Sequence, residues 1–161
     1  MSYAHLKSRF TVIAGAGVRP CKQPTSTPQT IQDMVGRNSK DLRILLVEDV
    51  DDTRLFMRLE LEQQGFIVFE AEDGRSAVDV ATKESPDVIL MDLTMPHMDG
   101  FSAAKLIRKK SGKLQTIPII AVTAHQETDF RSDARASGFD AYVTKPIDIN
   151  SLKELIDGLL I

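Results

Sequence analysis

Cysteine is almost absent from this chain, which contains one, Cys21, among 161 residues. A single cysteine permits no intrachain disulfide, so the composition fits a reducing, cytoplasmic compartment. Long hydrophobic runs are also missing, because no stretch approaches the roughly 20 apolar residues that span a bilayer. These two absences predict a cytoplasmic protein that is not inserted in a membrane.

Acidic residues outnumber basic residues over most of the chain. Residues 1–37 contain five basic residues and one acidic residue, for a net charge of +4, whereas the remaining residues carry 15 basic and 22 acidic side chains, for a net charge of −7. An acidic body argues against a nucleic-acid-binding surface and favours the binding of cations. We therefore expect no direct nucleic-acid partner.

The first 40 residues differ in composition from the rest. Prolines 20, 24 and 28 alternate with serine and threonine, and neither helical nor strand periodicity is present. We predict that residues 1–40 form a disordered N-terminal extension and that residues 41–161 form one folded domain. A secretory or organelle-targeting segment is an alternative interpretation, but residues 10–18 are only weakly apolar and are interrupted by glycines.

Acidic residues directly follow two short apolar runs. Residues 88–91 precede Asp92, and residues 44–47 precede Glu48 and Asp49. Short apolar runs that end at a turn are typical of buried strands, and open α/β sheets place their chemistry at the C-terminal edge of the strands. Two neighbouring strands would bring three carboxylates together there, which is costly unless a cation lies among them. The predicted cation is Mg²⁺.

Two further apolar runs deliver a hydroxyl and an ammonium group. Residues 119–122 precede Thr123, and residues 141–144 precede Lys145. Carboxylates, a hydroxyl and a lysine at successive strand ends are the groups that handle a phosphoryl group. A metal and the lysine neutralise its oxygens, the hydroxyl donates a hydrogen bond, and a carboxylate acts as the nucleophile.

Helical patterns alternate with these strands. They cover residues 53–64, 74–84, 101–110, 127–137 and 150–160, and glycine or proline follows closely after each of the first four. Such residues are typical of helix ends. This alternation predicts an α/β fold of five strands and five helices, with a doubly wound parallel sheet covered by helices on both faces.

These features resemble the receiver domains of two-component response regulators, over about residues 41–161. The residues that carry the resemblance are, in chain order, Glu48 and Asp49, Asp92 within the loop MDLTMPHMDG, Thr123 and Ala124, and Lys145 and Pro146. The resemblance implies the flavodoxin-like strand order 2-1-3-4-5. It also implies a cis peptide bond before Pro146.

The resemblance assigns a role to each phosphoryl-handling residue. Asp92 would be the phosphoacceptor, and Thr123 and Lys145 would bind the phosphoryl group. Thr123 and Tyr142 would form the switch that reports phosphorylation. The protein would be a phosphoacceptor that assists its own phosphorylation and dephosphorylation, not an enzyme with a separate substrate.

The same resemblance implies a set of metal ligands. Glu48, Asp49 and the backbone carbonyl of Thr94 would join Asp92 in holding Mg²⁺. Clustered oxygen ligands with open positions suit a hard cation that keeps several of its waters.

Partners follow from the resemblance as well. A histidine kinase or a histidine phosphotransfer protein would supply the phosphoryl group. No output domain follows the last predicted helix, so we expect a single-domain response regulator. It would signal by contact with a downstream protein, or pass the phosphoryl group to a phosphotransfer protein.

Two alternatives stay open beside this interpretation. Residues 49–53 fit the D-x-D-x-T signature of haloacid-dehalogenase-like phosphatases, in which Asp49 would be the nucleophile. That interpretation leaves Asp92 and its loop without a role. The second alternative is a phosphorylation-independent binding module. Whichever interpretation holds, Asp51 and Asp52 suit the cap or the first turn of a helix.

Overall fold

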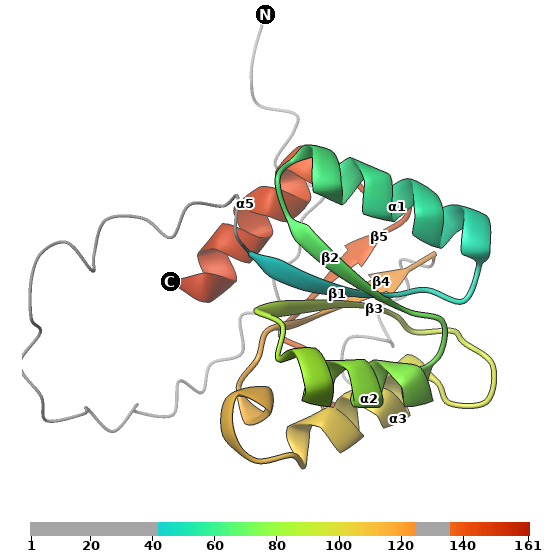
Figure 1. Cartoon of the computed structure of the whole chain (residues 1–161), viewed down its shortest axis with the longest axis vertical. Helices are drawn as coiled ribbons and strands as arrows, with labels where there is room; N and C mark the ends of the chain where they lie inside the picture. Colours follow the sequence, from blue (N-terminus) through green and yellow to red (C-terminus); the bar gives the residue numbers. More distant parts are fainter. Residues whose placement is uncertain (1–41, 125–135) are drawn as a thin grey trace, which may run out of the picture.

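The computed structural model of the chain describes residues 42–124 and 136–161 (Figure 1). In chain order its elements are β1 (Arg43–Val47), α1 (Asp51–Gln63), β2 (Ile67–Ala71), α2 (Gly74–Glu84), β3 (Val88–Asp92), α3 (Gly100–Arg108), the 3₁₀ helix η4 (Gly112–Gln115), β4 (Ile119–Thr123), β5 (Ala141–Thr144) and α5 (Ile149–Leu160). The predicted extension over residues 1–40 lies outside the described residues, as does nearly all of the helix predicted over residues 127–137. The short helix η4 was not predicted.

The strands form one parallel sheet in the order β2-β1-β3-β4-β5, which confirms the predicted doubly wound topology. Helices α1 and α5 lie on one face of this sheet, and α2 and α3 lie on the other (Figure 1). Every residue of β3 and of β4 is buried. Because helices cover both faces, these central strands are continuously apolar up to their last residue and do not alternate with polar positions.

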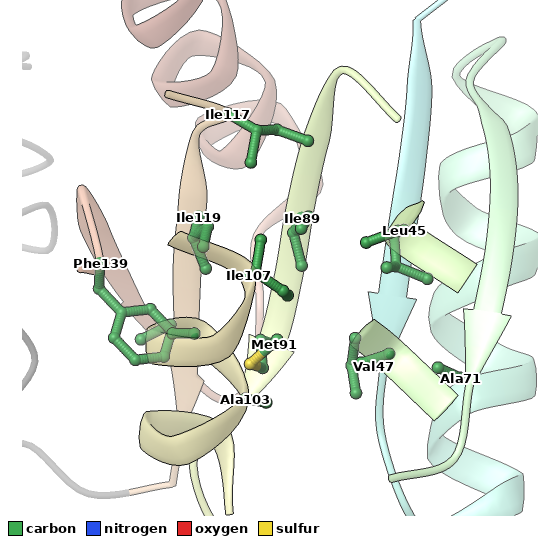
Figure 2. Packing of buried hydrophobic residues seen from close by; sticks show 14 of the residues in the cluster. Leu45, Val47, Ala71, Ile89, Met91, Ala103, Ile107, Ile117, Ile119 and Phe139 are labelled. Atoms are coloured by element: carbon green, nitrogen blue, oxygen red, sulfur yellow. The ribbon is translucent and has the colours of Figure 1, made fainter. Parts of the chain in front are cut away.

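Side chains of the central strands alternate between two buried clusters, one on each face of the sheet. The cluster beneath α2 and α3 includes Leu45, Val47, Ile89, Met91, Ala103 and Ile107 (Figure 2). The cluster beneath α1 and α5 includes Ile44, Leu46, Leu61, Leu90, Ile120, Leu152 and Ile156. Full burial of a leucine or isoleucine side chain contributes roughly 1.5–3 kcal/mol. The two clusters therefore hold the sheet edge, and the polar groups on it, in a fixed place.

Aspartates begin three of the helices. The carboxylates of Asp73, Asp99 and Asp148 accept hydrogen bonds from backbone amides in the first turns of α2, α3 and α5 respectively. Helix α1 differs, because its N-cap residue is Val50 and no side chain caps it. Asp51 and Asp52 lie in its first turn, so of the two predicted roles only the interaction with the helix dipole applies.

No helix among residues 42–124 and 136–161 could span a membrane. None of these helices combines the length and the apolar character that a bilayer span requires.

Candidate functional site

The C-terminal ends of the central strands meet at one edge of the sheet. Glu48 and Asp49 follow β1, and Asp92 is the last residue of β3. In the parallel register Asp92 lies opposite Val122 of β4, and Thr123 lies opposite Thr144 of β5. The strand ends that the sequence analysis singled out are therefore neighbours in space.

Three carboxylates form a cluster at this edge. Glu48, Asp49 and Asp92 each offer one oxygen, and these oxygens lie within 4.8 Å of one another. Glu48 is 1% exposed and Asp92 is 7% exposed, while Asp49 is half-buried. Oxygen ligands of this kind, grouped closely and open to solvent on the side of Asp49, fit a hard divalent cation such as Mg²⁺.

Lys145 binds two of these carboxylates. Its Nζ atom donates hydrogen bonds to Oδ2 of Asp92 at 2.8 Å and to Oε2 of Glu48 at 2.6 Å. Its backbone amide donates to the carbonyl of Thr123 at 2.8 Å, which anchors Lys145 to the end of β4. The peptide bond between Lys145 and Pro146 is cis, as the resemblance implied.

The electrostatics of this contact favour a charged lysine. Burial by itself lowers the pKa of Lys145, but the hydrogen bonds and charges of Asp92 and Glu48 outweigh it, so the pKa lies above its ordinary value. Burial raises the pKa of Glu48, and the contact with Lys145 offsets this rise only in part. The three carboxylates of the cluster therefore share a single ammonium group, which leaves two formal negative charges in excess.

The loop after β3 fixes the other oxygen of Asp92. The backbone amide of Thr94 donates to Oδ1 of Asp92 at 2.8 Å. Gly100 packs so closely against this segment that an added Cβ would lie 2.3 Å from the backbone oxygen of Asp92. The amide of Gly100 also donates to the carbonyl of Leu93 at 3.1 Å. The predicted metal-binding role of the exposed Thr94 carbonyl stays a prediction.

Thr123 and Tyr142 lie on one face of the sheet. Tyr142 is in register with Ala121, two residues before Thr123, and side chains two residues apart on a strand share a face. Thr123 is 6% exposed, and the half-buried Tyr142 packs against the cluster beneath α2 and α3. Their predicted role as a switch stays a prediction.

Arg54 of α1 is a site residue that the sequence analysis missed. Its Nη1 atom donates to the backbone carbonyl of Glu48 at 2.7 Å. The only signal in the sequence is an arginine about one helical turn beyond Asp49, and arginines on helix surfaces are too common for that spacing to identify a contact.

The fold and the site together define a flavodoxin-like α/β domain with an acidic cluster bridged by a lysine. Residues 44–157 match the response regulator receiver domain family, and the chain belongs to this family. Receiver domains accept a phosphoryl group on an aspartate from histidine kinases or phosphotransfer proteins, and they bind Mg²⁺ at an acidic pocket.

Individual relatives share most of the length of the domain. The chain is 38% identical over 119 residues to protein PilH of Pseudomonas aeruginosa, covering 73% of this chain and 97% of PilH. It is 30% identical over 118 residues to sporulation initiation phosphotransferase F of Bacillus subtilis, covering 73% of this chain and 93% of that protein. The receiver domain of sensor histidine kinase PA1611 from Pseudomonas aeruginosa, solved with a magnesium ion in its active site cleft, is similar with a TM-score of 0.69 and 32% identity, over 74% of this chain and 98% of that chain.

Proposed function

We propose that this protein is a single-domain response regulator that accepts a phosphoryl group on Asp92 in an Mg²⁺-dependent reaction. The observation that carries the proposal is the position of Asp92. Asp92 belongs to the acidic cluster and contacts Lys145 on one oxygen and a backbone amide on the other. Glu48 has the same kinds of contact, but its amide contact is longer, at 3.4 Å against 2.8 Å, and Glu48 is 1% exposed whereas Asp92 is 7% exposed. A nucleophile held in this way is aligned before the phosphoryl donor arrives.

Glu48, Asp49, Asp92 and the Thr94 carbonyl would hold Mg²⁺ in this proposal, with Glu48 acting through a water molecule. The acidic cluster supports this ligand set, as does the magnesium ion in the related PA1611 domain. When bound, the metal neutralises the charge of the transferred phosphoryl oxygens. Lys145 would then exchange part of its contact with Glu48 and Asp92 for the incoming phosphoryl group.

The bonds that form and break in the transfer belong only to the donor and to Asp92. A carboxylate oxygen of Asp92 attacks the phosphorus of a phosphohistidine, and the P–O bond forms as the P–N bond breaks. The electron pair of the broken bond stays on the imidazole nitrogen, which takes up a proton from solvent. Lys145 and the Thr123 hydroxyl bind the equatorial oxygens, where negative charge accumulates.

A histidine kinase or a histidine phosphotransfer protein would be the donor. The Bacillus subtilis relative is a sporulation initiation phosphotransferase by name, which supports a place for this chain in such a transfer sequence. The chain covers 97% of PilH, which supports the proposal that a single domain of this size can function by itself. The downstream target would be a protein bound by the phosphorylated surface.

Thr123 and Tyr142 would transmit the effect of phosphorylation at Asp92 to β5. A phosphoryl group on Asp92 offers oxygens that attract the Thr123 hydroxyl, and Tyr142 on the same face would turn into the space that this movement leaves. Shifting a two-state population from about 1:99 to 99:1 takes roughly 5.5 kcal/mol of differential stabilisation. Charge-assisted hydrogen bonds to Lys145 and Thr123 are of the size needed.

Labelling with a radioactive acyl phosphate in the presence of Mg²⁺ tests this function. Wild-type protein should incorporate label that hydroxylamine removes, because the product is an acyl phosphate. Asp92→Asn should incorporate none, and Asp99→Asn, in the same loop but outside the cluster, should label as wild type does. Equal labelling of Asp92→Asn and wild type would refute the assignment.

A comparison of Asp49→Asn with Asp92→Asn tests the phosphatase alternative. If Asp49→Asn abolished turnover of a phosphate ester while Asp92→Asn retained it, Asp49 would be the nucleophile. The structure offers no contact that favours this outcome within its described residues, since Lys145 is bonded to Glu48 and Asp92 and not to Asp49.

A further inference from the structure

Arg54 joins the acidic loop to two other elements. Besides donating to the Glu48 carbonyl at 2.7 Å, its guanidinium forms an ion pair with Asp51 in the first turn of α1. Its Nε atom lies 3.4 Å from Oε1 of Glu70 on β2. The side chain is only 15% exposed. Its planar fork of donors therefore connects the loop after β1, the start of α1 and the edge strand β2.

We propose that Arg54 is a positioning residue for the metal site, acting through the peptide bond between Glu48 and Asp49. The proposal rests on the proposed function of the acidic cluster. Because a peptide unit is planar, fixing the Glu48 carbonyl also fixes the orientation of the Asp49 backbone amide. It also fixes the position of the Asp49 Cα atom, from which the side chain departs.

The surroundings of Asp49 make this anchor important. The amide of Glu48 is held by the carbonyl of Ala71 at 3.1 Å, so the preceding peptide is fixed by β2. The carboxylate of Asp49 forms no hydrogen bond or ion pair with the described residues, unlike those of Glu48 and Asp92. Its position depends on the backbone, and Arg54 is the side chain that holds this backbone from the side of α1.

Charge and positioning predict opposite effects on metal binding. A nearby guanidinium repels a divalent cation, so removal of its charge alone would strengthen Mg²⁺ binding. If Arg54 acts by positioning, its removal weakens binding, because the carboxylate of Asp49 is no longer directed toward the cation. The sign of the change therefore decides between the two roles.

Arg58 provides a matched control on the same helix. Its Nη1 atom lies 3.0 Å from Oε2 of Glu70, so it shares the carboxylate partner of Arg54. Its described hydrogen bonds do not reach the loop after β1. Arg58→Met removes one positive charge and one contact with Glu70, as Arg54→Met does, but leaves the Glu48 carbonyl bound.

The experiment measures Mg²⁺ dissociation constants of the full chain by NMR titration, without phosphodonor. Loss of a supporting contact around metal ligands costs about 10-fold or more in affinity, so we expect Arg54→Met to bind Mg²⁺ about 10-fold more weakly. Arg58→Met should stay within about twofold of wild type, because half-exposed ion pairs contribute little. Arg54→Lys, which keeps the charge but not the fork of donors, should lie between Arg54→Met and wild type.

Unfolding by urea in EDTA separates this effect from a loss of stability, since it reports on the metal-free fold. Arg54→Met binding Mg²⁺ as tightly as Arg58→Met, or more tightly than wild type, would overturn the positioning role. Should Arg54→Met not fold, equal affinity of Arg54→Lys and wild type would overturn it. Asp49→Asn is measured in parallel: if it leaves the titration unchanged, the proposed metal site itself is wrong, whereas its loss of binding leaves the question to the arginine variants.

Discussion

Lys145 and Glu48, separated by 97 positions in the sequence, are joined by a hydrogen bond of 2.6 Å between Nζ and Oε2. Glu48 is 1% exposed, so its carboxylate has given up most of its contact with water. Removing a charge from water is costly unless a partner compensates it. Lys145 provides this compensation, and it does so while also contacting Asp92.

Loss of Lys145 should therefore destabilise the metal-free fold. We expect Lys145→Met to lower the free energy of unfolding in EDTA at neutral pH by about 2 kcal/mol, because two clustered carboxylates lose their shared donor. Adding Glu48→Gln should recover most of this loss, since the amide carries no charge. Urea denaturation checks both values, with the exposed Lys105→Met as a control expected within about 0.5 kcal/mol of wild type. Equal stability of Lys145→Met and wild type would contradict the interpretation.

Mg²⁺ should stabilise the folded chain through its carboxylates. At a free concentration of about 100 times the dissociation constant, the gain in unfolding free energy is about 2.7 kcal/mol. Asp49→Asn and Asp92→Asn should lose most of this gain, because each substitution removes one negative charge from the cluster. Asp52→Asn, exposed in the first turn of α1 and outside the cluster, should keep it. Unfolding curves recorded with and without Mg²⁺ provide the measurement, and an undiminished gain in Asp49→Asn would argue against the site.

Gly100 should tolerate no side chain. A Cβ there would lie 2.3 Å from the backbone oxygen of Asp92, so Gly100→Ala must shift the segment that carries Asp92. We expect a loss of about 1–3 kcal/mol in unfolding free energy, together with slower labelling of Asp92. Gly158→Ala in α5 meets no atom within 4 Å and should gain roughly 0.5–1 kcal/mol. Similar effects of the two substitutions would show that the contact with Asp92 is unimportant.

The start of α2 should respond to pH through Asp73. Hydrogen bonds from the backbone amide and hydroxyl of Ser76 hold the pKa of Asp73 below its ordinary value of 3.8. A carboxyl whose pKa is lower in the folded state stabilises the fold fully above its unfolded pKa, and this contribution is lost as the pH falls through the folded pKa. Asp73→Asn keeps the cap but not the charge, so its stability difference from wild type should be constant above about pH 5 and disappear in acid.

Asp73→Ala serves as the second variant for this helix. It removes the cap itself and should cost about 1 kcal/mol at neutral pH. Urea unfolding across the acidic range compares the three proteins. If the difference between wild type and Asp73→Asn did not change with pH, the hydrogen bonds of the charged form would contribute nothing.

Thr123 should couple phosphorylation to β5. We expect Thr123→Ala to accept the phosphoryl group on Asp92 more slowly, by up to about 100-fold, because one donor to the developing charge is lost. NMR shifts on phosphorylation should persist in the loop after Asp92 but diminish in residues 141–157. If those residues responded equally in Thr123→Ala and wild type, the proposed coupling to Tyr142 would be wrong.

Much of the fold could be predicted from the sequence because the signals are local. Each apolar run before Glu48, Asp92, Thr123 and Lys145 marked a strand, and the parallel topology places strand ends at one edge. The helix predicted over residues 74–84 begins and ends as predicted, because Asp73 and Pro86 act on adjacent residues. Helix α1 begins before the predicted start, since no side chain caps it and the local signal was weak.

The sequence by itself determined which chemical groups reach the sheet edge, and their order along the chain was enough to identify the family. Only the tertiary structure decided which of these groups contact one another. It pairs Lys145 with Glu48 as well as Asp92, leaves Asp49 half-buried, and brings Arg54 to the Glu48 carbonyl. These contacts depend on distances between segments that packing alone brings together, and hydrogen bonds form only within a few tenths of an ångström. Local periodicity cannot encode such distances, because the same pattern of residues is compatible with many side-chain arrangements at the same edge.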